Sequence, residues 1–208
     1  MTELRRVFIV CFIAVLPIAS SSCKKVNPPP AMAPAKHDVD WTPVPLADLL
    51  AKVQVRPFKQ VLTPAVGDDD DDGNTNDTPR LLWDSFLDYH SQFHRLSGKD
   101  WYRTSLLFRD RLIALAKDTG LDAASLSRCL DAFAAAPDNG VAYVPVGAFA
   151  AQYGKEPAWI VVYCWENIGR VIGKDGHTIL TLDTTLSHIY VRVIQMSDAK
   201  EVAMVHCK

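Results

Sequence analysis

The sequence predicts an α+β domain, in which three antiparallel helices precede an antiparallel sheet of about four or five strands. The first observation is the helical spacing of apolar residues between residues 78 and 137, with capping residues and glycines at the ends of the runs. The second is a change after Asn139-Gly140 to extended, largely apolar stretches that short turn signals separate. Helices first and hairpin-connected strands second are typical of the α+β class.

The helices are predicted from their ends as much as from their apolar stripes. A short helix is expected at residues 46–53, and residues 54–63 show no clear pattern. Three longer helices follow, and the short loops between them predict antiparallel packing of neighbours. Their capping residues are Thr78, Asp100 and Asp122, and they end at Gly98, Gly120 and Pro137.

The second half of the chain reads as strands. Residues 159–165 (WIVVYCW) are apolar on both faces, which is typical of a central strand. Between Ser187 and Met196, apolar residues alternate with His188, Tyr190 and Arg192, so one face of that strand is polar or aromatic. The predicted strands are 141–153, 159–165, 177–183, 187–196 and 201–207.

Composition excludes several classes of protein. The 208 residues are 49% hydrophobic and 22% charged, with a net charge of -2, which excludes a collagen, a coiled-coil rod, a fully disordered chain and a disulfide-dense scaffold. The near-neutral charge also argues against a nucleic-acid binder that works by bulk charge.

The first 22 residues have the layout of a secretory signal. Arg5 and Arg6 precede an apolar run of about 13 residues, which is too short for a membrane span of about 20. Small residues stand directly before Cys23, an ending that resembles the lipobox of bacterial lipoproteins, although Ser20 stands where that family prefers leucine. The resemblance implies that cleavage precedes Cys23 and that acyl chains on this cysteine anchor the protein in a membrane. An ordinary secretory signal that is cut a few residues earlier is the alternative.

The mature chain divides into three parts. Residues 23–45 form a lipidated, proline-rich tether, residues 46–77 an N-terminal arm and acidic linker, and residues 78–208 a single α+β domain. Lys24 follows the lipid cysteine, where some lipoproteins carry the aspartate that retains them at the inner membrane. In a Gram-negative source, the resemblance therefore implies an outer-membrane protein that faces the periplasm.

The acidic linker contains a candidate calcium site. Asp68, Asp70 and Asp72 precede Gly73 with the alternate spacing that lets carboxylates converge on a hard cation. The twelfth position of such a loop is Pro79 instead of a bidentate glutamate, and no convincing helix precedes it. A solvated linker is therefore the favoured interpretation.

Two groups of histidines are candidates for metal binding or acid–base chemistry. His90 and His94 are four apart on the first long helix, which is the spacing of a zinc pair, but Ser91 replaces the glutamate of the HExxH protease motif. We favour partly buried histidines at a helix–sheet seam. The second group lies in the strand half and matches no motif, so half-exposed packing is favoured there as well. It comprises Glu166, His177, His188 and His206.

Residues 173–176 (GKDG) resemble the GxxG loop with which K-homology domains clamp RNA. In that family the loop lies between two helices, whereas here the flanking segments look extended. A hairpin loop is the favoured interpretation. The hairpin interpretation, the export signal and the near-neutral net charge together argue against a nucleic-acid partner.

The five cysteines divide by position. Cys11 leaves with the signal and Cys23 takes the lipid. Exported proteins meet an oxidising compartment, so a disulfide between Cys164 and Cys207 is predicted, because both lie on predicted strands. Cys129 lies on a helical core stripe and is predicted to be buried and free. The alternative is two or three unpaired buried thiols.

The sequence therefore predicts a lipid-anchored cell-envelope protein with a non-catalytic binding or accessory domain, whose partner is an envelope protein. It contains no GxSxG elbow, Walker loop or dinucleotide fingerprint. No cofactor is expected, apart from the calcium or zinc that the candidate sites would take. The alternative is a metal-binding protein or hydrolase that uses His90 and His94 or the strand histidines.

Overall fold

The computed structural model describes residues 44–64, 78–98, 100–134, 141–172, 178–181 and 185–207. They belong to one compact unit, Asp40–Lys208. The lipid cysteine Cys23 and the candidate calcium ligands Asp68, Asp70 and Asp72 lie outside the described residues. None of the helices within the described ranges is long and apolar enough to span a membrane.

The α+β class is confirmed, and most predicted helices and strands lie within a few residues of their predicted bounds. The helices are α1 (Leu46–Lys52), α2 (Thr78–Phe93), α3 (Trp101–Asp118) and α4 (Ala123–Ala132). The strands are β1 (Gln54–Pro57), β2 (Leu96–Ser97), β3 (Val141–Tyr153), β4 (Glu156–Asn167), β5 (Gly169–Ile172), β6 (Thr178–Thr181), β7 (Thr185–Leu186), β8 (His188–Gln195) and β9 (Glu201–Cys207).

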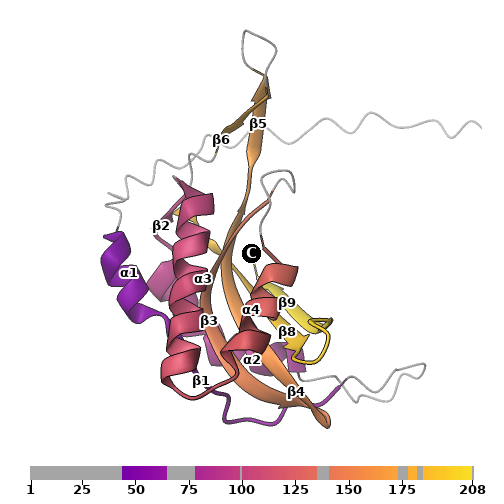
Figure 1. Cartoon of the computed structure of the whole chain (residues 1–208). Helices are drawn as coiled ribbons and strands as arrows, with labels where there is room; N and C mark the ends of the chain where they lie inside the picture. Colours follow the sequence, from indigo (N-terminus) through magenta and orange to yellow (C-terminus); the bar gives the residue numbers. More distant parts are fainter. Residues whose placement is uncertain are drawn as a thin grey trace, which may run out of the picture. The chain divides into compact units, whose positions relative to one another are not determined.

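The main sheet is mixed and has the strand order β1-β3-β4-β8-β9 (Figure 1). β3, β4, β8 and β9 pair antiparallel, as predicted. β1 was not predicted and pairs parallel with β3, so the purely antiparallel sheet is corrected at this edge. Parallel pairing is possible here because a long connection that contains α2, α3 and α4 separates the two strands.

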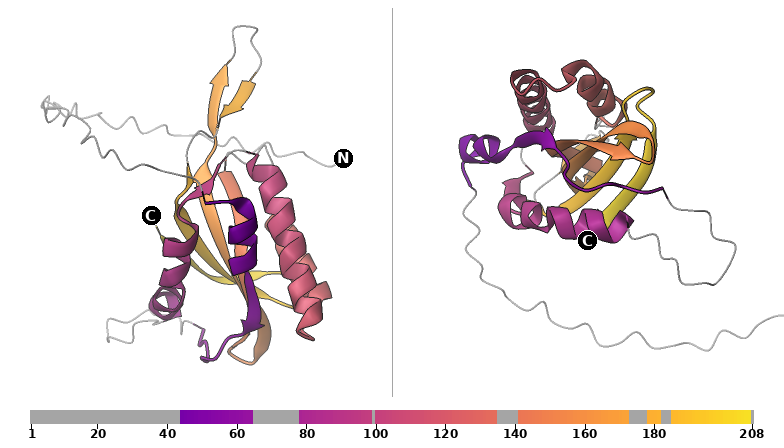
Figure 2. Two further views of the ribbon diagram at one scale, coloured as in Figure 1. Left: turned by 90° about the vertical axis from the view of Figure 1, so that its left-hand side faces the viewer. Right: turned by 90° about the horizontal axis from the view of Figure 1, so that it is seen from below.

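Helices cover both faces of this sheet (Figures 1 and 2). On one face the ring centroids of Phe86 in α2 and Phe149 in β3 are 4.6 Å apart. On the other face, the indole N–H of Trp159 in β4 donates to the hydroxyl of Ser125 in α4 over 2.8 Å. Residues 158–165 of β4 are consequently all buried, as predicted for a central strand. α3 and α4 pack beside each other, whereas α2 lies on the opposite face of the sheet (Figure 2). α2 still meets α3 at its end, where the ring centroids of Phe93 and Phe108 are 6.2 Å apart.

The N-terminal arm is part of the folded core. α1 and β1 bring Leu49, Val53 and Val55 into the core, and Leu62 follows them. All four side chains are at most 7% exposed. The α+β domain therefore begins near residue 44 and not at the predicted boundary, Thr78.

Of the predicted capping residues, Asp122 is observed to cap its helix. The side chain of Asp122 accepts a hydrogen bond from the amide of Ser125 over 2.9 Å and so caps α4. Asp100 stands at the N-cap of α3 but has a left-handed backbone, with φ of 52°, and makes no side-chain cap. The hydroxyl of Thr78 donates instead to the carbonyl of Thr63 over 2.6 Å. This bond ties the start of α2 to the N-terminal arm.

The segments around residues 173–176 agree with the hairpin interpretation. β5 and β6 pair antiparallel, with Ile172 opposite Thr178. The GKDG residues themselves, and His177, lie outside the described residues. Because strands flank them, the context of a K-homology loop is not present.

Candidate binding site on the sheet

Seven side chains pack together on the face of the sheet that α3 and α4 partly cover, and six of them carry rings. Side chains on neighbouring strands share a face when their residues are directly opposite, so the strand register groups them. We call this group the aromatic–histidine cluster. It consists of Tyr143, Tyr163, Trp165, His188, Tyr190, Arg192 and His206.

Two of the predicted strand histidines meet at Trp165. The centroid of the Trp165 ring is 4.9 Å from that of His188 and 4.7 Å from that of His206. Tyr190 lies 5.0 Å from His206 on the other side. Trp165 is 6% exposed, whereas His206 is exposed and the side chain of His188 is 30% exposed. The imidazoles therefore form the solvent side of the cluster and the indole forms its floor.

Glu166 places a carboxylate at this end of the cluster. Its Oε2 lies 3.4 Å from Nε2 of His188 and accepts a hydrogen bond of 3.4 Å from the hydroxyl of Ser187. The structure thus brings together three of the four predicted strand residues, Glu166, His188 and His206. Within the described residues, no group of three or more histidine, cysteine, aspartate or glutamate side chains is arranged to hold a metal ion.

Arg192 holds the other end of the cluster. Its guanidinium forms an ion pair with Glu201 and is 4.5 Å from the centroid of Phe133 and 4.6 Å from that of Tyr190. A third ring, Tyr143, lies 5.5 Å away. The side chain of Arg192 is only 13% exposed. A mostly buried cation is stable here because a carboxylate neutralises it and aromatic faces surround it.

Burial changes the chemistry of the phenols in the cluster. It raises the pKa of Tyr163 and, to a smaller extent, that of Tyr190, while nearby Arg192 opposes both shifts. Both phenols are therefore neutral at physiological pH. The hydroxyl of Tyr163 and the indole N–H of Trp165 have no hydrogen-bond partner among the described residues. Such buried donors are costly to leave unpaired.

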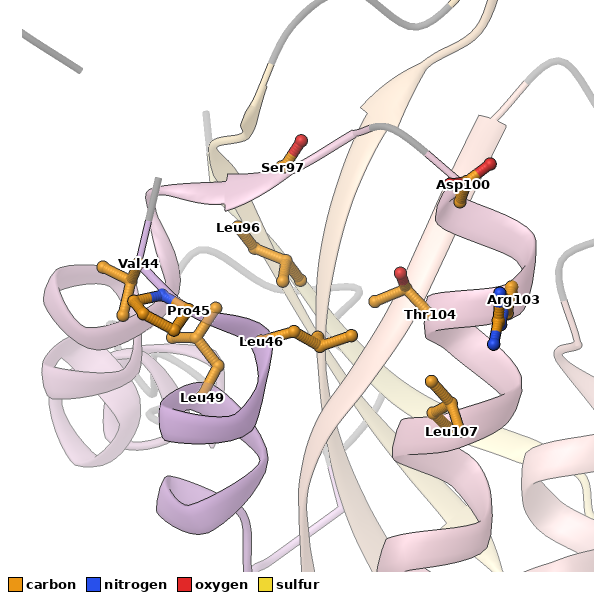
Figure 3. Close-up of a pocket in the computed structure, with 10 residues that line it drawn as sticks. All are labelled: Val44, Pro45, Leu46, Leu49, Leu96, Ser97, Asp100, Arg103, Thr104 and Leu107. Carbon is orange, nitrogen blue, oxygen red and sulfur yellow. The ribbon is translucent and has the colours of Figure 1, made fainter. Parts of the chain in front are cut away.

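A second concave site lies between α1 and α3, near the β1 edge of the sheet. This α1–α3 cleft has a volume of about 410 Å³. Figure 3 shows Leu46 pointing from α1 toward α3, where Thr104 and Leu107 face the cleft. It is lined by Val44, Pro45, Leu46, Leu49, Leu96, Ser97, Asp100, Arg103, Thr104 and Leu107.

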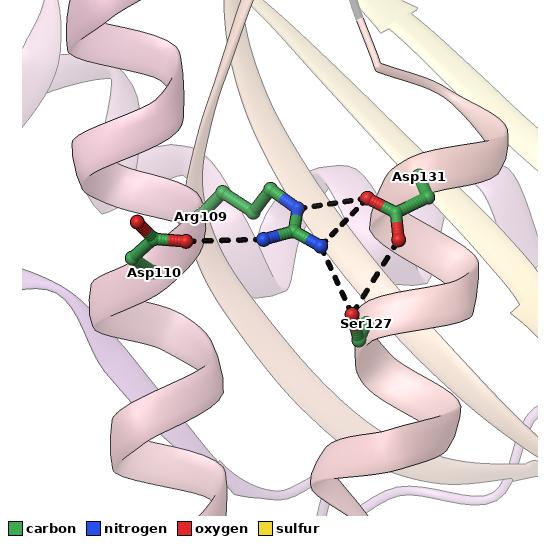
Figure 4. A network of polar contacts seen from close by, with 4 residues as sticks. All are labelled: Arg109, Asp110, Ser127 and Asp131. Atoms are coloured by element: carbon green, nitrogen blue, oxygen red, sulfur yellow. Dashed lines mark hydrogen bonds and ion pairs between the residues drawn. The ribbon is translucent and has the colours of Figure 1, made fainter.

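A polar network joins α3 to α4 (Figure 4). Arg109 of α3 donates to Asp131 of α4 over 2.8 Å and to the hydroxyl of Ser127 over 3.0 Å. It also donates to Asp110 over 3.0 Å. Because each side chain already has a partner and the site is partly exposed, the network contributes to helix packing and offers no open site.

The rings of the candidate zinc ligands His90 and His94 are stacked, with His90 exposed and His94 half-buried. The ring centroids of His90 and His94 are 5.9 Å apart with 17° between the planes. Nδ1 of His94 is 2.8 Å from the carbonyl oxygen of Ser91, so this nitrogen carries the proton and donates. The pair lies at the C-terminal end of α2 and is separate from the cluster.

The predicted disulfide is corrected by the strand order. Ile189 of β8 pairs with Cys164 of β4 on one side and with Cys207 of β9 on the other. Two strand spacings, roughly 10 Å, therefore separate the two cysteines, whereas a disulfide needs about 4.4–6.8 Å between Cα atoms. Cys164 is buried and free, and so is Cys129, as predicted for the latter.

Comparison of the chain with family models, curated proteins and solved structures gives no match. The candidate site is therefore defined by its own geometry. The rings of β3 and β4 were not predicted as site residues. The alternation of His188, Tyr190 and Arg192 was the available signal, because it placed all three on one face.

Proposed function

We propose that the protein is a lipid-anchored cell-envelope protein whose α+β domain binds an envelope partner without catalysing a reaction. The secretory signal and the lipobox-like ending at Cys23 support the anchor. One observation carries the binding role: the cluster reaches the edge strand β9, where His206 and Met204 are exposed. Aromatic rings and histidines combine apolar contact area with polar atoms, and such side chains are common at protein interfaces.

The contacts of Glu166 favour binding over hydrolysis. In a serine hydrolase the histidine lies between the hydroxyl and the carboxylate, so that it can take the proton of the hydroxyl. Here the carboxylate of Glu166 contacts both the hydroxyl of Ser187 and the ring of His188. This order holds the imidazole in place but gives Ser187 no histidine base.

A photo-crosslinking residue at Met204 tests the binding role in cells. Met204 is 42% exposed on β9 and faces the same side as the cluster, whereas Leu87 is 49% exposed on α2, across the sheet. We expect a discrete adduct from position 204 that is absent from position 87 and is lost when His188 and His206 are both replaced by alanine. Equal adducts from the two positions, or no adduct from position 204, would contradict the proposal.

The anchor is tested separately. We expect the mature N-terminal peptide to carry acyl chains on Cys23 and the protein to fractionate with membranes. Cys23→Ser should release the protein into the soluble fraction. An unmodified mature N-terminus would disprove the anchor without affecting the binding role.

Metal binding through His90 and His94 is the second candidate function, because the two rings lie side by side at the C-terminal end of α2, with centroids 5.9 Å apart. A metal-dependent role would require further ligands from a partner or from water. Metal analysis of the purified protein separates this candidate from the first.

A further inference from the structure

The α1–α3 cleft is apolar where the chain enters it. Val44 and Pro45 are the first described residues and already form part of its lining. Leu46 and Leu107 are 36% and 41% exposed, and Leu49 and Leu96 lie buried behind them. Apolar side chains left open at the entry point of the chain indicate a place where another apolar group packs.

We propose that this cleft is the docking site of residues 40–43, with the indole of Trp41 packed among its leucines. Trp41 is the one tryptophan, tyrosine or phenylalanine between Lys24 and Pro43. It precedes Val44 by three positions, which limits its distance from the cleft lining to about 10 Å. The compact unit of the chain also begins at Asp40, directly before this residue.

The size and chemistry of the cleft suit an indole. The cleft volume of about 410 Å³ leaves room for one indole ring. A tryptophan side chain that fills such a site buries about 150–250 Å² of surface. Arg103 on the rim has no ion-pair partner among the described residues and can accept the carboxylate of Asp40 as its partner.

Docking would fix the point at which the tether leaves the domain. The free spacer would then run from Lys24 to Val39, which spans roughly 50 Å as extended polyproline. A partner that uses the cleft would first have to displace Trp41. This inference does not depend on the lipid at Cys23 or on the binding role of the cluster.

Fluorine NMR of the complete mature chain tests the inference. Every tryptophan is replaced by 5-fluorotryptophan, and Trp41→Phe identifies the resonance of Trp41. We expect this resonance to show a solvent isotope shift well below that of an exposed indole. We also expect it to move in Leu107→Ala, which removes part of the cleft lining, and to stay in place in Leu87→Ala, the matched exposed leucine on α2.

Two controls keep the result decisive. The resonance of Trp83, on α2, should not move in Leu107→Ala, and Leu46→Ala should reproduce the effect on Trp41 if Leu107→Ala perturbs the fold. A Trp41 resonance with the full solvent isotope shift of an exposed indole would overturn the inference. So would a Trp41 resonance that stays in place in both Leu107→Ala and Leu46→Ala. Protection of Trp41 that disappears on dilution would also overturn it, because a second copy would then supply the indole.

Discussion

Replacing Gly147 by alanine measures how tightly α2 packs on β3. A β-carbon at this position would lie 2.8 Å from Cε1 of Tyr89 and 3.0 Å from both Cζ and the hydroxyl oxygen. Relaxed contacts between carbon atoms are about 3.5–4.0 Å. The ring of Tyr89 cannot move away freely, because it stacks on Phe93 at 5.8 Å and meets Phe149 edge-on at 5.9 Å. The added methyl group therefore overpacks the core.

Overpacking of this kind costs about 1–3 kcal/mol of unfolding free energy. For a domain of this size, each kcal/mol lowers the melting temperature by about 2–4 °C. Urea unfolding followed by circular dichroism measures the change, provided that the slope with denaturant is constant. Tyr89→Leu should relieve the clash, so that Gly147→Ala costs less in that background.

Gly120→Ala is the matched control. Gly120 has a φ of +72°, and no atom lies within 4 Å of the position that a β-carbon would take there, so its substitution costs only backbone strain, about 1–2 kcal/mol. That cost should be the same with tyrosine or leucine at position 89. The reasoning is refuted if Gly147→Ala leaves the urea midpoint unchanged, or if its cost is equal in the two backgrounds.

Three further predictions concern single groups. Asp122→Ala should lower the unfolding free energy by about 1 kcal/mol at neutral pH, because the helix cap is lost. The hydrogen bond from the Ser125 amide holds the pKa of Asp122 below its ordinary 3.8, so the stability difference between the two proteins should vanish as pH falls through the lowered pKa. Thermal melts at several pH values measure this difference. Burial raises the pKa of the Cys129 thiol to about 11 and also raises the pKa of the Cys164 thiol. Neither thiol should therefore react with a thiol reagent until denaturant is added. Rapid labelling of either thiol in the folded protein would contradict this expectation. The purified protein should hold no stoichiometric zinc, because His90 and His94 supply two ligands of the usual four; zinc that is lost on replacing both would reverse this expectation.

Helices and strands with strong periodicity were predictable from the sequence. The last strand was predicted at its observed bounds, 201–207, because its turn signal and its apolar residues agree. β1 was missed because four residues, Gln54–Pro57, are too short to show a pattern and their partner is far along the chain. The pairing partner of a strand is tertiary information that local spacing does not contain.

The candidate site was only partly predictable for the same reason, because the sequence does not show which strands are neighbours. Alternation in β8 placed His188 with Tyr190 and Arg192, but β4 is apolar on both faces, so its sequence did not show which face Trp165 occupies. The strand order was also needed to decide whether Cys164 and Cys207 can form a disulfide. With β8 between them, Cys164 and Cys207 lie on strands that are not neighbours in the sheet.

The parallel pairing of β1 with β3 has a consequence for the order of folding. The paired residues Gln54 and Gly147 are 93 positions apart in the chain, so the pair closes a long loop and carries a large entropic cost until the intervening helices have formed. β3 to β9, in contrast, are joined by short turns and pair mainly with neighbours in the chain. The N-terminal arm is synthesised first and, on this reasoning, docks last. Until it docks, the β1 edge of β3 is open to another extended chain.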